Sequence, residues 1–268
     1  MNALSSLSSI YSSNAARVQI QIDAIQLQID SGSKTLSTRE QSEVTSLSEK
    51  STSLAAIDSS ISQAKNIVSV AKTGLDSIAG ILTQMQRLAG QASTPGLANS
   101  DFMFFNMRYQ HMLTQVGEFA IKAQLNGANL LSGTAVLNVK TGIEINPASN
   151  MVIQPVNIMR MISAGILGGT RIDDGQSAMQ ALDAVRAAMA TVSNGTFQLR
   201  LSTHQLDNMS KLNTASGSSV QDQIQSLQTL DTHALQNQLQ LLKNQQTIDY
   251  QLMNQFSEKA ASFLTIMV

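Results

Sequence analysis

The sequence predicts a mainly α-helical protein: a long antiparallel helical bundle or coiled coil with a small β-hairpin insertion. Apolar residues alternate in steps of three and four from position 54 to position 92, and this period keeps one apolar seam facing a partner helix. Pro95, Pro147 and Pro155 all lie in the central third, so the flanking stretches can be continuous helices. A helix of fifty residues is roughly 75 Å long, which no compact core requires.

Composition excludes several classes of function. The 268 residues include no Cys and no Trp, and only 13% are charged. A net charge of -1 offers no basic surface for nucleic acid or for an anionic membrane. No stretch approaches the roughly twenty apolar residues of a membrane span, and residues 1–13 lack the cationic start of a secretory signal. We therefore expect no nucleic-acid partner, no membrane insertion and no cleavable signal peptide.

The N-terminal half predicts three helices. An arm over residues 4–29 is followed by a hinge at residues 31–33, where Ser-Gly-Ser interrupts the period. Beyond a charged stretch at residues 38–50, the long seam runs to about Ser93. After the turn at residues 94–96, a third helix is expected over residues 100–125, capped by Ser100 or Asp101 and antiparallel to the second. The seam of the second helix consists of Leu54, Ile57, Ile61, Ala64, Val68, Ala71, Leu75, Ile78, Leu82 and Met85.

The centre of the chain changes character. Residues 126–133 form a loop bounded by glycines, and short β-favouring runs between 135 and 158 predict two or three strands in a small hairpin. Gly165, Gly168 and Gly169 mark a second flexible stretch. The helical period returns with a capping box from Asp173 to Gln176. It continues past Gly195 and Gly217, each of which costs roughly 1 kcal/mol relative to alanine.

Two domains are expected from this organisation. Residues 1–40 and 225–268 would form a discontinuous terminal coiled-coil domain, and residues 41–224 a long-helix bundle with its insertion at about 134–172. Amphipathic arms of this kind are marginal alone in water, so we expect them to pair with each other and with neighbouring copies. The alternative is that both arms fold onto the bundle as ordinary amphipathic helices. The expected assembly seam comprises Val18, Ile22, Ile25, Ile29, Leu235, Leu239, Leu242, Leu252, Phe256 and Phe263.

Several motifs resemble those of bacterial flagellins. The hinge segment Ile29-Asp30-Ser31-Gly32-Ser33-Lys34 is similar to the family's "I-x-S-G-x-R/K". Residues 192–208 resemble "V-S-x-x-R-x-x-L-G-x-x-Q-N-R-L-D". The most specific likeness is to the turn "A-x-F-N-G-x-x-L-L-x-G", which is matched by Asn126, Gly127, Leu130, Leu131 and Gly133. With the glutamine-rich C-terminal arm, the resemblance covers nearly the whole chain.

The resemblance implies a structural subunit that self-assembles into the flagellar filament for motility, outside the cell, after export through a type III apparatus. Its partners would be copies of itself, hook-associated and cap proteins, and an export chaperone on the C-terminal arm at Leu235, Leu239, Leu242 and Leu252. An innate immune receptor reads an arginine in the second long helix of many members. Gln84 occupies the matching position here, so we expect weak or absent receptor activation.

Departures from the family leave alternatives open. Residues 8–14 replace the usual "N-T-N", Thr38-Arg39-Glu40-Gln41 stands where "D-D-A-A-G" is usual, and the chain ends without the common leucine pair. The hook–filament junction protein shares the same plan and is the first alternative. A type III secreted translocator or effector is the second, although residues 158–167 are too short for its strongly apolar helical pair.

An enzyme is the least favoured class. His111, His204 and His233 are widely spaced and form no metal-ligand pair. Asp173-Asp174-Gly175 lacks the alternating acidic ligands of a calcium loop, and the glycines at 165–169 are not followed by the Lys-Ser/Thr of a phosphate loop. We expect no catalytic residues, no cofactor and no metal.

Overall fold

The computed structural model describes the backbone of residues 2–143 and 149–266, and the side chains of these residues except 2–5, 260 and 263–266. The chain divides into two compact units. The terminal unit contains the residues up to Ser48 and those from Gln221 onward, and the central unit contains Glu49–Val220. Each unit is described separately below.

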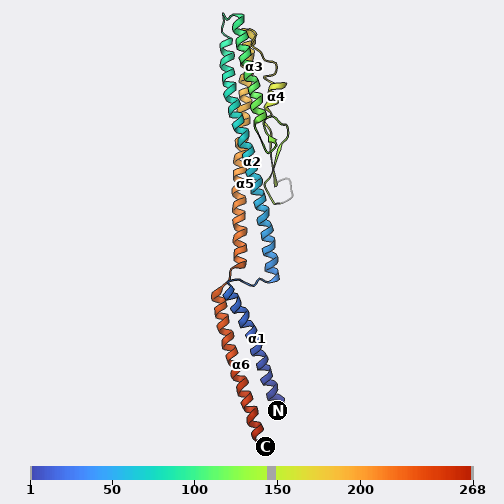
Figure 1. The fold of residues 1–268 in the computed structure, drawn as a ribbon, viewed down its shortest axis with the longest axis vertical. Coiled ribbons are helices and arrows are strands. Elements are labelled where there is room, and N and C mark those ends of the chain that lie inside the picture. Colours follow the sequence, from blue (N-terminus) through green and yellow to red (C-terminus); the bar gives the residue numbers. More distant parts are fainter. Residues whose placement is uncertain (1, 144–148, 267–268) are drawn as a thin grey trace. The chain divides into compact units, whose positions relative to one another are not determined.

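Long helices account for most of the chain, and two small antiparallel strand pairs lie between them (Figure 1). This confirms the predicted fold class. The helices are α1 Asn2–Ser31, α2 Thr38–Ala92, α3 Asn99–Lys122, α4 Ile158–Ser163, α5 Gly175–Gln228 and α6 Thr232–Ile266. The strands are β1 Gln124–Leu125, β2 Ala128–Asn129, β3 Leu137–Lys140 and β4 Asn150–Ile153.

Within the central unit, α2 and α5 pack antiparallel along the predicted seams. Lys65 forms an ion pair with Asp207 at 2.6 Å, and the Asn213 side chain donates to the Leu54 carbonyl at 2.8 Å. Alternating steps of three and four bring one apolar face of each helix to the other. The buried members of this core include Ile57, Ile61, Val68, Ala71, Leu75, Ile78, Leu82, Met85, Ala178, Ala181, Val185, Ala188, Val192, Leu199 and Leu206.

Helix α3 returns along α2 as predicted, but its cap lies two or three residues before the expected one. Ala98 is the N-cap residue, and its backbone N–H donates to the Asp101 carboxylate at 2.9 Å. Asp101 is therefore the third helical residue and not the cap itself. At the other end of α3, Gly74 of α2 lies so close to Ala123 and Leu131 that a Cβ there would overlap both. The glycine thus lets α2 approach the end of α3.

Three residues predicted to be helical follow Lys122, and two of them form a strand. Gln124 and Leu125 pair with Asn129 and Ala128 across a two-residue turn. Asn126 has φ +51° and Gly127 has φ +79°, the left-handed backbone that Asn-Gly adopts in hairpin turns. The Asn-Gly turn therefore ends the helix at Lys122, although the apolar period continues to Leu125.

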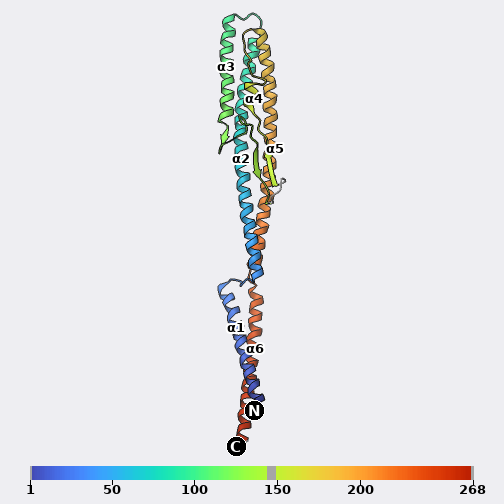
Figure 2. The same ribbon diagram turned by 90° about the vertical axis from the view of Figure 1, so that its right-hand side faces the viewer.

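The predicted hairpin is present as β3 and β4, paired from Leu137 opposite Ile153 to Lys140 opposite Asn150. Val139 and Ile153 are buried in the central core, so the hairpin lies against the helices (Figures 1 and 2). The predicted strand residue Ile145 lies outside the described residues. Sequence reasoning missed the short helix α4, because its six residues are too few to show a helical period.

Helix α5 also begins differently from the prediction. Asp174, not Asp173, caps it: the Asp174 carboxylate accepts the Ser177 N–H at 2.7 Å. The Ser177 hydroxyl in turn accepts the backbone N–H groups of Asp173 and Asp174 at 2.8 Å each. The cap is thus one residue later than the Asp-to-Gln spacing suggested. These hydrogen bonds lower the pKa of Asp174.

Serine and threonine side chains recur along the long helices. Many of their hydroxyls donate to the carbonyl four residues earlier. The same carbonyl also accepts the backbone N–H of that serine or threonine in the helix. On α2 these donors are Ser42, Thr45, Ser48, Thr73, Ser77 and Thr83, at 2.8–3.1 Å. On α5 they are Thr191, Thr203 and Thr214.

Candidate assembly site

The terminal unit is built around α1 and α6, which run antiparallel side by side (Figure 1). The Gln246 amide donates to the Gln19 side-chain oxygen at 2.6 Å. Further along the pair, the rings of Tyr11 and Phe256 stack with centroids 5.7 Å apart and an angle of 12°. These two contacts fix the register between the helices.

The predicted seam residues line this pair. Val18, Ile22 and Ile25 are buried on α1, and Ile29 is half-buried. Their neighbour Ala15 is also buried and was missed, because alanine gives little apolar signal in a period analysis. On α6 the predicted residues are half-buried: Leu235, Leu239, Leu242, Leu252 and Phe256. The side chain of Phe263 lies outside the described part of the chain.

A second apolar stripe lies on the outward face of each helix. On α1, Ile20 and Leu27 are 69% exposed, and on α6, Leu241 and Ile248 are 68% and 55% exposed. Each pair is spaced by seven residues, like the seam itself, and lies away from it on the helix surface. The register places all four within the same stretch of the pair. Two long helices therefore leave apolar surface that their mutual packing does not cover.

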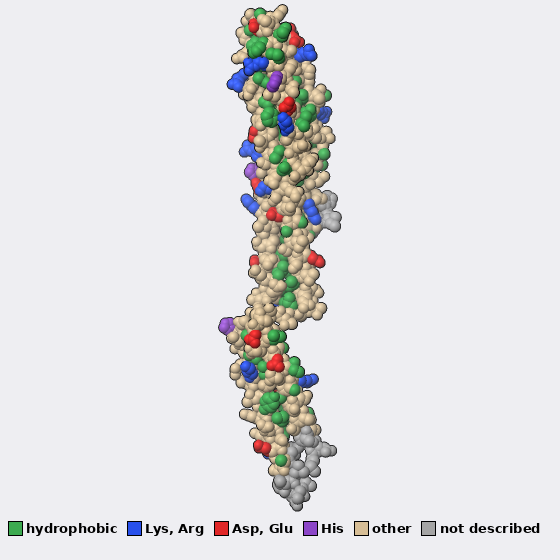
Figure 3. Space-filling model, viewed as in Figure 1, with side chains coloured by type: hydrophobic (Ala, Val, Ile, Leu, Met, Phe, Trp, Pro, Cys, Tyr) green, Lys and Arg blue, Asp and Glu red, His purple; other side chains and the backbone are tan. Residues whose placement is uncertain are grey.

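The surroundings of these stripes are mostly uncharged. Glutamine, asparagine and serine fill the faces of α1 and α6, and Figure 3 shows charged side chains scattered over a larger uncharged surface. Amide and hydroxyl groups are easier to remove from water than charged groups, provided that they find hydrogen-bond partners. These faces can therefore enter a crowded interface at low cost.

One buried polar group stands out inside the pair. The Asp249 side chain is only 7% exposed, and its Oδ2 atom has no hydrogen-bond partner among the residues that the structure describes. Asp249 lies one turn beyond Gln246, so the antiparallel register places it across from the part of α1 near Ala15. A buried carboxylate oxygen without a donor is costly. The α1–α6 contact is therefore weaker than its apolar seam alone would make it.

A clamp holds the connection between α1 and α2 against the end of α5. The Lys34 ammonium lies 2.6 Å from the Glu40 carboxylate and donates to the Leu227 carbonyl at 3.1 Å. Ser37 donates to the same carboxylate through its N–H and its hydroxyl, each at 2.8 Å. The bonds from Lys34 and Ser37 lower the pKa of Glu40 from 4.5 to about 2.

The loop motif lies in the central unit, where it joins α3 to the insertion. Leu130 and Leu131 are buried, and Asn126 and Gly127 form the exposed turn. The Leu130 carbonyl accepts the Val156 N–H at 2.7 Å, and the Leu131 carbonyl accepts the Ile158 N–H at 2.6 Å. The motif is thus a junction between two segments of the insertion.

Asn129, which the motif analysis did not select, holds this junction together. Its amide donates to the carbonyls of Ala120 and Ile121 at 2.9 Å each, at the end of α3. Its side-chain oxygen accepts the N–H groups of Leu131 and Ser132 at 2.7 and 2.9 Å. Gly133 lies close to the Asn129 backbone: a Cβ added to Gly133 would be 3.0 Å from the Asn129 carbonyl oxygen.

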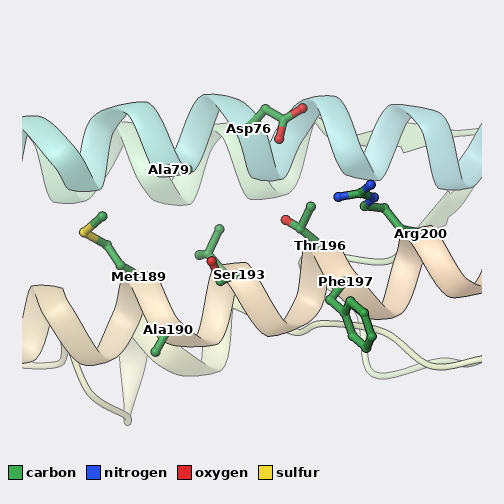
Figure 4. Close-up of a pocket in the computed structure, with 9 residues that line it drawn as sticks. Asp76, Ala79, Met189, Ala190, Ser193, Thr196, Phe197 and Arg200 are labelled. Atoms are coloured by element: carbon green, nitrogen blue, oxygen red, sulfur yellow. The ribbon is translucent and has the colours of Figure 1, made fainter.

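A groove of about 460 Å³ lies between α2 and α5 in the central unit (Figure 4). Ala79 of α2 and Met189 of α5 lie between the two helices, Ala190 lies exposed on the far side of α5 at the margin, and Asp76 and Arg200 lie toward one end. Arg200 extends toward α2, yet it forms no ion pair with Asp76 among the described residues. The groove is open and shallow, and it gathers no set of side chains suited to acid–base chemistry.

Groups for other kinds of chemistry are sparse. His111, His204 and His233 lie on three different helices, and no group of three potential metal ligands occurs among the side chains that the structure describes. Within the described helices, none is long and apolar enough to span a membrane. Gln84, the position matched to the receptor-binding arginine, is exposed on α2.

Comparison with known proteins identifies solved structures with a similar fold. No protein-family model matches the sequence, and no curated protein does. A solved structure of a Vibrio parahaemolyticus protein described as flagellar hook-associated superposes with a TM-score of 0.60. The two chains share a fold. The superposition covers 71% of this chain and 98% of the Vibrio chain at 14% identity. Bacillus cereus flagellin superposes with a TM-score of 0.49 at 18% identity, covering 56% of this chain and 86% of that one.

Proposed function

We propose that this chain is a structural subunit of the bacterial flagellum that polymerises outside the cell into a filament, as a flagellin does. The α1–α6 pair carries the proposal, because each helix presents an outward apolar stripe that its partner leaves uncovered. The fold shared with a flagellar hook-associated protein supports a flagellar setting. The terminal unit would then be the discontinuous assembly domain, and the function would be mechanical.

The stripes explain how such a subunit would polymerise. Ile20 and Leu27 on α1, and Leu241 and Ile248 on α6, offer two different surfaces. Two different surfaces that bind each other form head-to-tail contacts, which continue as an open helix when the rotation does not close. Burial of a large aliphatic side chain contributes about 1.5–3 kcal/mol, so four residues per copy supply a substantial drive.

A second candidate is the hook–filament junction protein, which would join two structures without polymerising. The likeness to a hook-associated protein over 71% of this chain favours it. The outward stripes would serve either role, because both roles require contacts between neighbouring subunits. The two roles differ in whether contacts between identical copies continue indefinitely.

Further partners follow from the proposed role. Hook-associated and cap proteins would bind at the ends of the assembly. An export chaperone would bind α6 at Leu235, Leu239, Leu242 and Leu252 before export. Because these four side chains face the α1–α6 seam and are half-buried there, the chaperone would take the place of α1. Chaperone binding and pairing with α1 would therefore exclude each other.

Seeded polymerisation in high sulfate, observed by negative-stain electron microscopy, tests the proposal. Sulfate strengthens the burial of apolar surface, so the full chain should form filaments, and a chain lacking residues 1–30 and 230–268 should not. Replacing Ile20 and Leu27 by glutamine should slow elongation while helix content is unchanged. The matched control replaces Ile121 of α3, which is 54% exposed, by glutamine. A full chain that stays monomeric with seeds would favour the junction protein.

The receptor prediction has its own test. Gln84 is exposed on α2, but an amide lacks the charge and the five-donor fork of arginine. We expect weak or absent activation of the innate receptor in a reporter-cell assay. Gln84→Arg is the matched variant, and it should raise the signal if this position is the one that the receptor reads. Strong signalling by the unaltered chain would contradict the prediction.

A further inference from the structure

We infer that two different surfaces of the central unit bind each other between neighbouring copies: a ridge on α3 and the groove between α2 and α5. The ridge consists of Met103, Phe104, Met107 and Arg108. This contact rests on the proposed self-assembly and names a second place where copies meet. It involves no residue of α1 or α6.

The ridge is an apolar face of α3 that the rest of the central unit leaves open. Met103 is 75% exposed, Met107 65% and Phe104 50%. The Arg108 guanidinium lies over the Phe104 ring at 5.5 Å from its centroid, which holds a cation at one end of the apolar surface. Tyr109 and Val116, on the opposite face of α3, are buried against the core. The ridge therefore takes no part in the packing of its own unit.

The groove offers the complementary features. The small side chain of Ala79 leaves room for larger ones, Met189 and Val192 supply apolar walls, and Ala190 lies exposed at the margin. Asp76 provides an anion at one end (Figure 4). The side chain of Asp76 is exposed and forms no ion pair among the described residues, so it is available to a cation from outside. Arg108 is the cation that the ridge carries.

The order of these features along the helices selects one orientation. Helix α2 runs toward the turn at residues 93–98, so Ala79 lies nearer to that turn than Asp76. Helix α3 runs away from the same turn, so Met103 and Phe104 lie nearer to it than Arg108. On both surfaces the charged residue lies farther from the turn at residues 93–98, and the apolar residues lie nearer to it. Copies that point in the same direction can therefore match charge with charge and apolar with apolar.

The opposite orientation fails this match. Arg200 lies on the side of Asp76 away from the alanines (Figure 4). If two copies ran in opposite directions with Arg108 on Asp76, the apolar ridge would cover the Arg200 guanidinium and leave the space at Ala79 empty. Removing a guanidinium from water without a partner is costly. The parallel arrangement avoids this cost.

The parallel contact also requires a shift along the helix axis. Gly74 lies beside Ala123, and the turn joins Ala92 to Asn99, so Arg108 stands level with a part of α2 two to three turns beyond Asp76. Bringing Arg108 of one copy to Asp76 of the next shifts the copies by roughly 10–20 Å at 1.5 Å per residue. A head-to-tail contact with a constant shift propagates without closing.

Cross-linking between single-cysteine variants tests the contact, because the chain has no cysteine of its own. Met103→Cys and Ala190→Cys chains are mixed, polymerised with seeds in sulfate and treated with a short bis-maleimide linker. We expect a cross-linked dimer in the mixture and none with either variant alone. The matched control pairs Met103→Cys with Asn208→Cys, which is exposed on α5 about 27 Å along the helix from Ala190, and should give no product.

Charge reversal provides a second readout. Arg108→Asp or Asp76→Arg alone should raise the critical concentration for polymerisation about fivefold or more, because each sets like charges together. The double variant should restore it to within about twofold. The same reversal at Arg87, exposed on α2 and outside both surfaces, should have little effect.

The outcomes separate this contact from the proposed function. Filaments that give no 103–190 product, or a double variant that does not recover, overturn the contact and leave self-assembly intact. A chain that stays monomeric and gives no product overturns both. A 103–190 product without filaments supports the contact and contradicts the filament role.

Discussion

Asn129 uses both ends of its side-chain amide to join α3 to the loop that follows. The NH₂ group satisfies two carbonyls at the end of the helix, and the oxygen receives two backbone N–H groups of the loop. The last four carbonyls of any helix lack partners within the helix. In α3 the Ala123 N–H donates to the Phe119 carbonyl, and Asn129 donates to two of the remaining three. Leu130 and Leu131 reach the core because Asn129 fixes the backbone beside them.

Asn129→Ala should lower the free energy of unfolding of the central unit by about 2–3 kcal/mol, since it leaves several backbone groups unsatisfied. Urea unfolding followed by circular dichroism measures the change. Asn138→Ala is the control, because Asn138 is exposed on β3 and should change stability little. Equal effects at the two positions would show that the amide bonds of Asn129 contribute nothing specific.

The Lys34–Glu40 clamp should make the terminal unit sensitive to acid. The pKa of Glu40 in the folded chain is about 2, below the ordinary value of 4.5, so the folded state binds the proton less tightly than the unfolded state. The stabilisation is therefore fully present above pH 4.5 and is lost as the pH falls toward 2. Protease sensitivity of the connection at residues 32–37, measured from pH 6 to pH 2, should rise over this range.

Glu40→Gln should remove that dependence and leave the connection sensitive at every pH. Glu43→Gln is the control, because Glu43 is exposed one turn further along α2 and takes no part in the clamp. An unaltered chain whose sensitivity is constant down to pH 2 would contradict the assignment.

At the scale of the elements, α5 shows how a long helix accommodates its neighbours. Gly195 is buried in mid-helix, and a Cβ there would overlap the Val156 side chain that follows β4. Gly217 lies in the same helix with nothing within 4 Å of the place that a Cβ would take. The two glycines cost the helix the same propensity, but only Gly195 gains a contact in return.

Alanine substitution at these two glycines should therefore have opposite effects. Gly217→Ala should stabilise the chain by about 0.5–1 kcal/mol, the ordinary gain in helix propensity. Gly195→Ala should destabilise it by about 1–3 kcal/mol, because overpacking against Val156 outweighs the same gain. Thermal unfolding by circular dichroism compares them. Stabilisation by both substitutions would show that Val156 moves aside freely.

The buried Asp249 carboxylate limits the stability of the α1–α6 pair. Asp249→Leu should stabilise this pair by about 1–3 kcal/mol, since it removes a buried carboxylate oxygen that lacks a donor among the described residues and extends the apolar seam. Hydrogen exchange of α1 and α6 amides measures the change. Glu258→Leu, on an exposed position of the same helix, is the control. Equal protection in the unaltered chain and the Asp249→Leu chain would show that the carboxylate imposes no cost.

The elements were predictable to different degrees, for physical reasons. Long seams such as Leu54 to Met85 repeat the same signal many times, so the helices that carry them follow directly from the sequence. The ends of helices depend on single side chains, and there Asp174 and Ala98 replaced the expected caps. The role of Asn129 depends on carbonyls eight or nine residues away, and no periodicity reveals such a bond. The groove between α2 and α5 is lined by residues of two helices that lie more than 100 residues apart, such as Ala79 and Met189, so it required the structure.

At the scale of the whole molecule, the chain joins two compact units that differ in how completely their apolar side chains are buried. The central unit has a core of fully buried aliphatic side chains shared by α2, α3, α5 and the insertion. The terminal unit relies on the α1–α6 pair, whose predicted α6 seam residues are only half-buried. A core that is closed on all sides is stable by itself, whereas a two-helix contact is marginal.

Removing residues 1–30 and 230–268 should therefore leave the central unit folded. We expect a cooperative thermal transition close to that of the full chain, and hydrogen-exchange protection of α2, α3 and α5 between residues 54 and 213 should be retained. The measurement needs calorimetry and exchange on both chains under conditions that prevent polymerisation. Loss of the transition in the shortened chain would show that the arms are required for the central fold.

The hydroxyl groups along α2 and α5 give these helices a mechanical property. A serine or threonine that donates to the carbonyl four residues earlier shares that acceptor with the helix ladder, and such sites bend a helix at little cost. On α2 these donors fall in two groups, Ser42 to Ser48 and Thr73 to Thr83, so the bending that they allow is shared among several residues of each group. Each long helix can then bend elastically under a sideways load, and its backbone hydrogen bonds stay intact while it bends and straightens.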